Sequence, residues 1–187
     1  MLPVSALLGL CIGSFLNVVA WRVPRGESVV KPGSHCPGCG TPLKPYDNIP
    51  LLSWLILRGR CRTCKTTISV RYPLIELATA ALYVGTTAAL WGDWRELALG
   101  IVLITFLIPI TAIDLDVKRI PNALTLPAAL LAVPIAAVTE PAFIPEQLIA
   151  GAAATVFFLI PALIAKKGMG MGDVKLAGVL GLYLGAS

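Results

Sequence analysis

Two aspartates and four paired cysteines are the residues of this chain whose types and spacing best suit chemistry. Asp114 lies in the run AIDLDVKRIPN, and Asp173 lies in the run GMGMGDVKL, which includes Gly170, Gly172 and Lys175. Two close carboxylates do not both ionise, so a pair of this kind shares one proton. The ionised member activates a water and the protonated member donates to a substrate carbonyl. Such a pair would hydrolyse an amide without a covalent intermediate.

Both aspartates also have a plain structural interpretation. Asp173 stands where an N-cap is expected, directly before the apolar segment 174–187. Asp114 and Asp116 would then be exposed partners of Lys118 and Arg119. Spacing alone leaves this interpretation open beside the catalytic one.

The glycines before Asp173 have a physical use in a peptidase. Gly168, Gly170 and Gly172 can adopt backbone angles denied to other residues, and they let a substrate strand approach closely. Because a peptide must be extended to be cut, we expect helix-free backbone beside Asp173. The run is not a phosphate-binding loop, because no GK[ST] follows it.

The cysteines form two CxxC pairs with 21 residues between them, Cys36, Cys39, Cys61 and Cys64. Four thiolates at this spacing are typical of a closed, structural tetrahedral Zn²⁺ site, with redox pairs or idle thiols as the alternatives. Gly38, Gly40 and Gly59 suit the tight turns of such a site. His35 is an alternative ligand or a solvent-facing neighbour, and Cys11 is expected to pack within an apolar segment.

The composition indicates that these residues are positioned by a helical membrane protein. Hydrophobic residues make up 57% of the 187 residues and charged residues 13%, which excludes a disordered chain and leaves too little polar surface for a soluble globule. Transmembrane helices need about 20 mostly apolar residues. Six segments are candidates: Leu2–Trp21, Pro73–Trp91, Leu97–Ile113, Asn122–Val138, Gln147–Ala165 and Val174–Ser187. The fold class predicted is therefore all-α, a polytopic membrane protein of six spans with a zinc-binding cytoplasmic loop.

The charges predict the orientation. The net charge is +5, and 14 of the 15 Lys and Arg residues fall in alternate loops, nine of them in residues 22–72. The positive-inside rule makes those loops cytoplasmic and the N-terminus external. The alternative interpretation of this charge, nucleic-acid binding, is not needed. Glu76, within the second segment, is expected to hydrogen-bond inside the bundle or to reach the nearby boundary.

Three parts follow from this organisation. Residues 1–21 are a first transmembrane helix, 22–72 a cytoplasmic tetracysteine loop, and 73–187 a transmembrane core that carries both aspartates. The last segment has 14 residues, which rise about 21 Å against a hydrocarbon core of about 30 Å. We therefore expect the core to be incomplete at its C-terminus.

The ordered motifs resemble one known family across nearly the whole chain, the type IV prepilin peptidases. These are the bifunctional leader peptidase/N-methyltransferases of bacterial type IV pilus and type II secretion systems. The matching motifs are GSFLNVV with Arg22, the tetracysteine loop, Asp47–Pro50, Arg71–Glu76, the Asp114 run and the GxGD of Gly170–Asp173.

The resemblance implies that Asp114 and Asp173 are the catalytic aspartates. Asp114 precedes Ile120 by six residues, as the family's aspartate precedes its Ile-Pro, and Asp116 is the fallback. The implied substrates are prepilins and pseudopilins, cut at the cytoplasmic face of the bacterial inner membrane after a basic leader. The implied methyl donor is S-adenosylmethionine, for which no glycine-rich fingerprint is present. A GxGD leader peptidase without methylation and a non-catalytic, zinc-containing assembly subunit are the competing interpretations.

Overall fold

The computed structural model describes residues 1–164 and 170–185, and its described elements are helices joined by turns. The chain divides into two compact units, Met1–Ala88 and Ala89–Ser187. The cysteine loop lies in the first unit, and both aspartates lie in the second. Each unit is therefore the frame for one of the two candidate sites.

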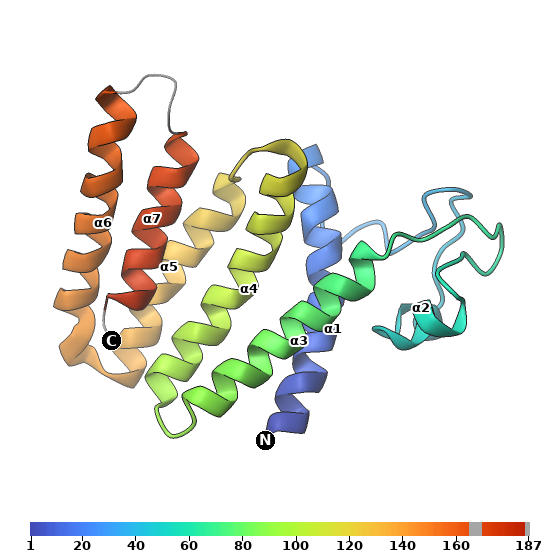
Figure 1. Ribbon diagram of the computed structural model, residues 1–187, viewed down its shortest axis with the longest axis horizontal. Helices are drawn as coiled ribbons and strands as arrows, with labels where there is room; N and C mark the ends of the chain where they lie inside the picture. Colours follow the sequence, from blue (N-terminus) through green and yellow to red (C-terminus); the bar gives the residue numbers. More distant parts are fainter. Residues whose placement is uncertain (165–169, 186–187) are drawn as a thin grey trace. The chain divides into compact units, whose positions relative to one another are not determined.

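The first unit consists of two long helices and the segment between them (Figure 1). Helix α1 spans Leu2–Arg22 and α3 spans Arg71–Ala89, and the connecting segment holds the short helix α2, Leu52–Ile56. Two glycines of α1 let it approach α3 closely. A Cβ on Gly9 would lie 2.5 Å from the Cα of Ala80, and one on Gly13 would lie 2.8 Å from the Cα of Glu76. The hydrophobic effect does not drive helices together within lipid. Close van der Waals packing at small residues stabilises such crossings instead.

The connecting segment also has two single-turn 3-10 helices. These are η1, Val23–Arg25, directly after α1, and η2, Pro45–Asn48, before α2. The remainder of the segment is turns and loops, which agrees with its lack of a continuous apolar run.

The second unit is a bundle of four helices (Figure 1). These are α4, Trp94–Val117, α5, Asn122–Thr139, α6, Ile144–Ile164, and α7, Met171–Leu184, with the turn η3, Pro141–Phe143, between α5 and α6. Helix α7 packs between α6 and α5, and α5 packs on α4. The core of this bundle is made by Leu99, Leu103, Ala128, Ala132, Val179 and Tyr183.

Small residues set the closeness of the helices in this bundle. Ala128 and Ala132 are fully buried on α5, and the Tyr183 hydroxyl donates to the carbonyl of Ala128 at 2.8 Å. On α7, a Cβ at Gly181 would lie 2.6 Å from the carbonyl oxygen of Ala150 in α6. The face of α6 turned away from α7 keeps Phe157 71% exposed, as a lipid-facing side chain would be.

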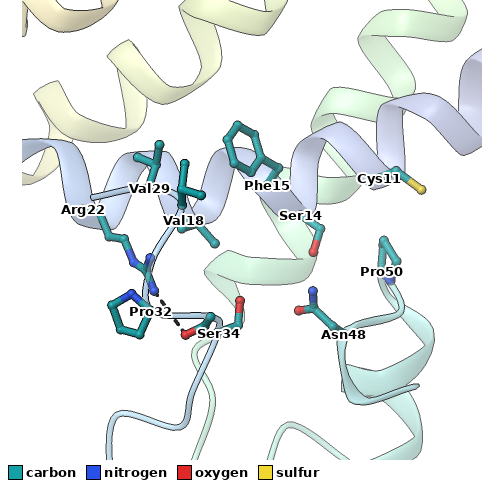
Figure 2. A pocket seen from close by; sticks show the side chains of 12 residues that line it. Cys11, Ser14, Phe15, Val18, Arg22, Val29, Pro32, Ser34, Asn48 and Pro50 are labelled. Carbon is teal, nitrogen blue, oxygen red and sulfur yellow. Dashed lines mark hydrogen bonds between the residues drawn. The ribbon is translucent and has the colours of Figure 1, made fainter. Parts of the chain in front are cut away.

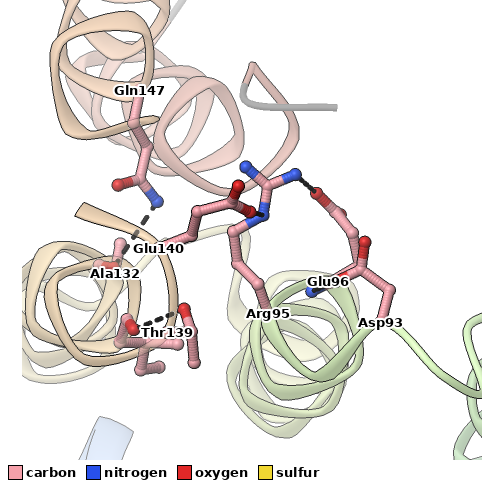
Figure 3. A network of polar contacts seen from close by, with 8 residues as sticks. Asp93, Arg95, Glu96, Ala132, Thr139, Glu140 and Gln147 are labelled. Atoms are coloured by element: carbon pink, nitrogen blue, oxygen red, sulfur yellow. Dashed lines mark hydrogen bonds and ion pairs between the residues drawn. The ribbon is translucent and has the colours of Figure 1, made fainter. Parts of the chain in front are cut away.

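A polar network closes the end of the second unit where α4 and α6 begin (Figure 3). The Arg95 guanidinium is 2.6 Å from Glu96 and 3.8 Å from Glu140, and it lies 3.8 Å from the ring centroid of Phe143. Arg95 is only 7% exposed. The two carboxylates compensate its charge, which would otherwise be costly to bury.

Within the described residues, four helical segments are long and apolar enough to cross a membrane, Leu2–Arg25, Trp94–Val117, Asn122–Thr139 and Pro141–Ile164. The chain is thus a multi-pass membrane protein. Helices α3 and α7 form within the predicted segments 73–91 and 174–187, but neither is among these four. Helix α3 carries Arg71 and Glu76, and α7 has 14 residues.

Candidate functional site

The two aspartate runs meet at one end of the second unit. Asp114 is in the last turn of α4, and Asp173 is in the first turn of α7. A Cβ on Gly172 would lie 2.9 Å from the Cβ of Ile120, so the backbone of the Asp173 run packs directly against the Ile120 side chain of the Asp114 run. The Lys175 ammonium also donates to the Asn122 side-chain oxygen at 2.9 Å. The fold therefore brings together two runs whose aspartates are 59 residues apart in the sequence.

The orientation of α4 distinguishes Asp114 from Asp116. Leu103, in the core against α5 and α7, precedes Asp114 by eleven residues, which is about three helical turns, so both side chains leave α4 on the same side. Asp116 is two residues further, about 200° around the axis. Asp114 is half-buried, and Asp116 is exposed. The side of α4 that faces α7 is therefore the side of Asp114.

Asp173 caps its helix, although not from the N-cap position. Helix α7 begins at Met171 with Gly170 as N-cap, and the Asp173 carboxylate accepts a 3.0 Å hydrogen bond from the Gly170 N–H. The plain N-cap interpretation of Asp173 is wrong, because the helix starts two residues earlier. Gly170, just before that start, is non-helical, whereas Asp173 itself lies in the helix. Asp173 is exposed, and its Oδ2 atom accepts the hydrogen bond from the Gly170 N–H.

The glycines of this run serve close approach rather than unusual backbone angles. Gly170 has φ −77° and ψ 147°, which any residue can adopt. Gly172 is within α7 and is not among the residues with positive φ, so the expectation of special angles at these two positions is wrong. Its role is to admit Ile120. Gly168, with Lys166 and Lys167, lies outside the described residues.

The four cysteine sulfurs of the first unit gather in one cluster. The Sγ atoms of Cys36, Cys39, Cys61 and Cys64 all lie within 4.8 Å of one another. Cys36 and Cys64 are 3.7 Å apart, and a zinc tetrahedron with Zn–S bonds of about 2.3 Å has sulfurs about 3.8 Å apart. The cluster thus has the composition and spacing of a tetrahedral metal site. All the cysteines are unbridged.

The cluster is made of two equivalent turns. In the first, the Cys36 N–H donates to the Thr41 carbonyl at 3.0 Å and the Gly40 N–H to the Cys36 carbonyl at 2.8 Å. In the second, the Cys61 N–H donates to Thr66 at 2.8 Å and the Lys65 N–H to Cys61 at 3.1 Å. Each turn thus presents its two sulfurs in the same way, so the CxxC repeat in the sequence is a repeat in structure.

Positive backbone angles fall where the turns require them. Gly40 has φ +69° and Gly59 φ +65°, as expected for tight turns. Gly38 has no positive φ, and its value is space: a Cβ there would lie 2.8 Å from Thr66 Oγ1 in the other turn. Two of the three glycines predicted for turns therefore act through φ, and the third acts through close approach.

The thiols of the cluster differ in acidity. Burial raises the pKa of Cys36 to about 11, while hydrogen bonds from the Thr66 side chain and backbone lower the pKa of Cys64 to about 6. Cys64 therefore offers a thiolate at neutral pH before any metal arrives. His35 is exposed, and its Nδ1 is 3.1 Å from the Gly33 carbonyl oxygen, so it is a solvent-facing neighbour of the cluster.

Two buried polar residues of the first unit join its parts, Asn17 between α1 and α3 and Glu76 between α3 and the connecting segment. Asn17, 6% exposed, donates to the carbonyls of Gly13 and Tyr72, each at 3.2 Å. Glu76, also 6% exposed, accepts from the N–H of Leu51 at 2.8 Å. The sequence left a hydrogen bond inside the bundle and a reach to the boundary open for Glu76, and its partner is a backbone N–H of the connecting segment. A polar residue in the middle of an apolar segment is the signal that finds such anchors.

A cavity lies beside the C-terminal half of α1, and no sequence motif predicted it (Figure 2). Arg22, 6% exposed, lines it and donates to the carbonyls of Ser28 at 2.8 Å and Gly33 at 3.4 Å. Cys11, in the apolar helix α1, lies on the same lining and is exposed.

Comparison with known protein families assigns both units to A24 peptidases. Residues 7–90 match the Bacterial Peptidase A24 N-terminal domain, and residues 101–187 match the Type IV leader peptidase family. The chain is therefore a membrane protein of the A24 peptidase class. No solved structure matches it significantly.

The curated relatives narrow this class. The chain is 41% identical to the prepilin leader peptidase/N-methyltransferase of Neisseria gonorrhoeae, over 99% of this chain and 74% of the relative. It is also 41% identical to that of Myxococcus xanthus, over 95% of this chain and 54% of the relative. A third relative, at 35% identity over 98% of this chain and 77% of the relative, is a type 4 prepilin-like proteins leader peptide-processing enzyme of Escherichia coli O78:H11. The chain belongs to the prepilin leader peptidase/N-methyltransferase family.

Proposed function

We propose that this protein is an aspartic endopeptidase of the membrane that removes the basic leader of type IV prepilins and pseudopilins. In this proposal it also N-methylates the new N-terminal residue. The observation that carries the proposal is the contact between the two aspartate runs, through Gly172 and Ile120 and through Lys175 and Asn122. Membership of the prepilin leader peptidase family indicates that the reaction of the aspartate pair is peptide-bond hydrolysis.

Asp114 and Asp173 are the catalytic pair of the proposal. The ionised carboxylate takes a proton from water as the oxygen attacks the scissile carbonyl, and the protonated carboxylate donates to the carbonyl oxygen. As the tetrahedral intermediate breaks its C–N bond, the carboxyl group that took the water's proton donates it to the leaving nitrogen. The other carboxylate takes back the proton of the carbonyl-derived hydroxyl, which restores the starting pair. Lys175 positions the site by bonding to Asn122, and Gly170 positions Asp173 by donating to its carboxylate.

The membrane arrangement belongs to the same proposal. Helices α3 and α7 join the four apolar helices as spans, which makes six, with the N-terminus external and residues 22–72 in the cytoplasm of the bacterial cell. The charge distribution supports this orientation, because nine Lys and Arg residues lie in that loop against two acids. Asp114 and Asp173 are then at the cytoplasmic boundary, where a basic leader meets an apolar stem.

Zinc and S-adenosylmethionine complete the proposal. The four cysteines hold one Zn²⁺ as a closed structural site that orders the loop, in agreement with their sulfur spacing. The methyl donor supplies an electrophilic methyl group to the amine released by cleavage. The names of the relatives favour this double activity. The complete cysteine cluster argues against a leader peptidase without methylation, and the aspartate pair argues against a non-catalytic subunit.

Leader cleavage by the natural full-length protein tests the proposal. Asp114→Asn and Asp173→Asn each remove a carboxylate of the pair, so we expect leader removal to fall by at least roughly a thousandfold, in the range of lost acid–base catalysis. Asp116→Asn, on another side of α4, is the matched control and should still cleave. Cleavage is read from the gel shift of a co-expressed prepilin, with membrane insertion checked by fractionation. Normal processing by both variants of the pair would exclude the mechanism.

A further inference from the structure

The cavity beside α1 has the size and position of a small-molecule site. Its volume is about 340 Å³, within the range of about 300–1,000 Å³ found for ligand pockets. One wall is α1, and the other is the loop segments 29–34 and 48–50 (Figure 2). The cavity thus lies wholly in the first unit, whereas the aspartate pair belongs to the second.

The lining of this cavity is amphipathic. Phe15, Val18 and Val29 supply apolar surface, and Ser14, Ser34 and Asn48 supply hydroxyl and amide groups that point into the same space in Figure 2. A ligand that fits such a lining has an apolar or aromatic part together with hydroxyl or amino groups. A purely apolar chain would leave the hydroxyls and the amide without partners.

Arg22 gives the ligand a charge. Its side chain is 6% exposed, and its recorded partners are two neutral carbonyls, the second at a long 3.4 Å. Within residues 1–164 and 170–185, no carboxylate forms an ion pair with Arg22, in contrast to Arg62 with Asp47 and Arg95 with Glu96. A buried guanidinium without an anion is costly. A carboxylate brought by a ligand would supply the missing counter-charge and a charge-assisted hydrogen bond.

We propose that this cavity is the site of the methyl donor, with Arg22 binding the carboxylate of S-adenosylmethionine. The inference rests on the proposed methyltransferase function and deepens it. The donor combines a carboxylate, an aromatic base and ribose hydroxyls, which matches the charge, the apolar wall and the hydroxyl and amide groups in turn. The donor also carries an ammonium and a sulfonium, for which the Ser14 and Ser34 hydroxyl oxygens and the Asn48 amide oxygen are the acceptors in the lining.

Direct binding to the full-length protein in lipid nanodiscs tests this site. Equilibrium dialysis against radiolabelled S-adenosylmethionine measures the dissociation constant. Ser14→Phe fills the cavity, and Arg22→Gln removes the charge; we expect each to weaken binding by roughly ten- to a hundredfold, as for loss of a hydrogen bond to a charged group. Leu8→Phe is the matched control, because Leu8 lies on the same helix, is 54% exposed and is outside the lining. Zinc content shows whether each variant keeps its folded loop.

The outcomes separate this inference from the proposed function. Wild-type affinity in both Ser14→Phe and Arg22→Gln, with methylation of the mature pilin intact, overturns the cavity as the donor site but leaves the methyltransferase standing. A wild-type protein that neither binds the donor nor methylates overturns both. Nanodiscs with and without phosphatidylglycerol form a further arm. Donor binding seen only without anionic lipid would assign Arg22 to a lipid phosphate and overturn the inference.

Discussion

Lys65 shows how a single residue departs from the symmetry of the cysteine cluster. It has φ +60° at the position where the first turn has Gly40 with φ +69°. A left-handed conformation costs a residue with a Cβ roughly 1–2 kcal/mol, and it costs glycine nothing. The second turn is therefore strained where the first is not, although both make the same backbone hydrogen bonds.

We predict that Lys65→Gly strengthens metal binding by the loop by roughly 0.5–1 kcal/mol. This gain is smaller than the strain that is relieved, because glycine loses more backbone entropy when the loop folds. The reciprocal change, Gly40→Lys, introduces the same strain into the first turn and should weaken retention by a similar amount. The measurement is the chelator concentration that removes half the zinc from the purified protein. Shifts of both variants in one direction would contradict the role assigned to φ.

Zinc content is the second prediction at this scale. The purified protein should carry one zinc per chain by atomic absorption, and Cys36→Ser should lose it, since the buried Cys36 sulfur lies 3.7 Å from that of Cys64. His35→Ala is the matched neighbour and should keep its zinc, because His35 is exposed and outside the sulfur cluster. A folded, metal-free wild-type protein would refute the assignment.

At the scale of elements, the ends of α4 and α7 decide whether the aspartate runs meet. Helix α4 ends at Val117, and Lys118 takes φ +52° and caps the helix by donating to the Asp114 carbonyl at 2.9 Å. The chain then passes Ile120 and re-enters a helix at Asn122. This short turn holds Ile120 against Gly172, so the contact depends on glycine having no Cβ.

Gly172→Ala and Gly170→Ala form a matched pair that tests this contact. A Cβ at Gly172 meets the Ile120 Cβ at 2.9 Å, whereas a Cβ at Gly170 meets the flexible Asp173 carboxylate at 3.2 Å. We expect Gly172→Ala to slow leader cleavage by roughly ten- to a hundredfold, as a shift of about 1 Å in a catalytic group does, and Gly170→Ala to slow it far less. Rates of prepilin cleavage give the comparison. Equal losses in the two variants would be inconsistent with the contact.

The helices themselves could be predicted from the sequence, because long apolar runs bounded by charged or proline-rich turns leave few alternatives. The cysteine cluster could be predicted for a similar reason, since the CxxC spacing fixes the local turn. The function of Gly172 could not, because it depends on Ile120, 52 residues away. The helix start at Met171 was missed for a local reason, since Asp173 caps the helix from its first turn by accepting from the Gly170 N–H rather than from the N-cap position. The partner of Glu76 and the cavity of Arg22 also depend on how a loop without regular periodicity folds back on α3 and on α1, respectively.

For the whole molecule, the distribution of charge is the feature that relates the two units to the membrane. Arg95 is the one basic residue outside the alternate basic loops, and its ion pairs with Glu96 and Glu140 neutralise it. The exception therefore leaves the charge asymmetry between the two sides intact. In the orientation proposed above, the cysteine loop and both aspartates lie on the side where the leader of a prepilin remains after membrane insertion.

We predict this orientation as a labelling pattern in spheroplasts. Ala142→Cys, in the exposed turn η3 between α5 and α6, should react with a membrane-impermeant maleimide before permeabilisation. Glu27→Cys, exposed in the long loop, is the matched control and should react only after permeabilisation. The physical reason is that residues 139–146 carry two Glu and no basic residue, whereas residues 22–72 carry nine basic residues. The reverse pattern would place the aspartates away from the cytoplasm and remove the basis for leader cleavage there.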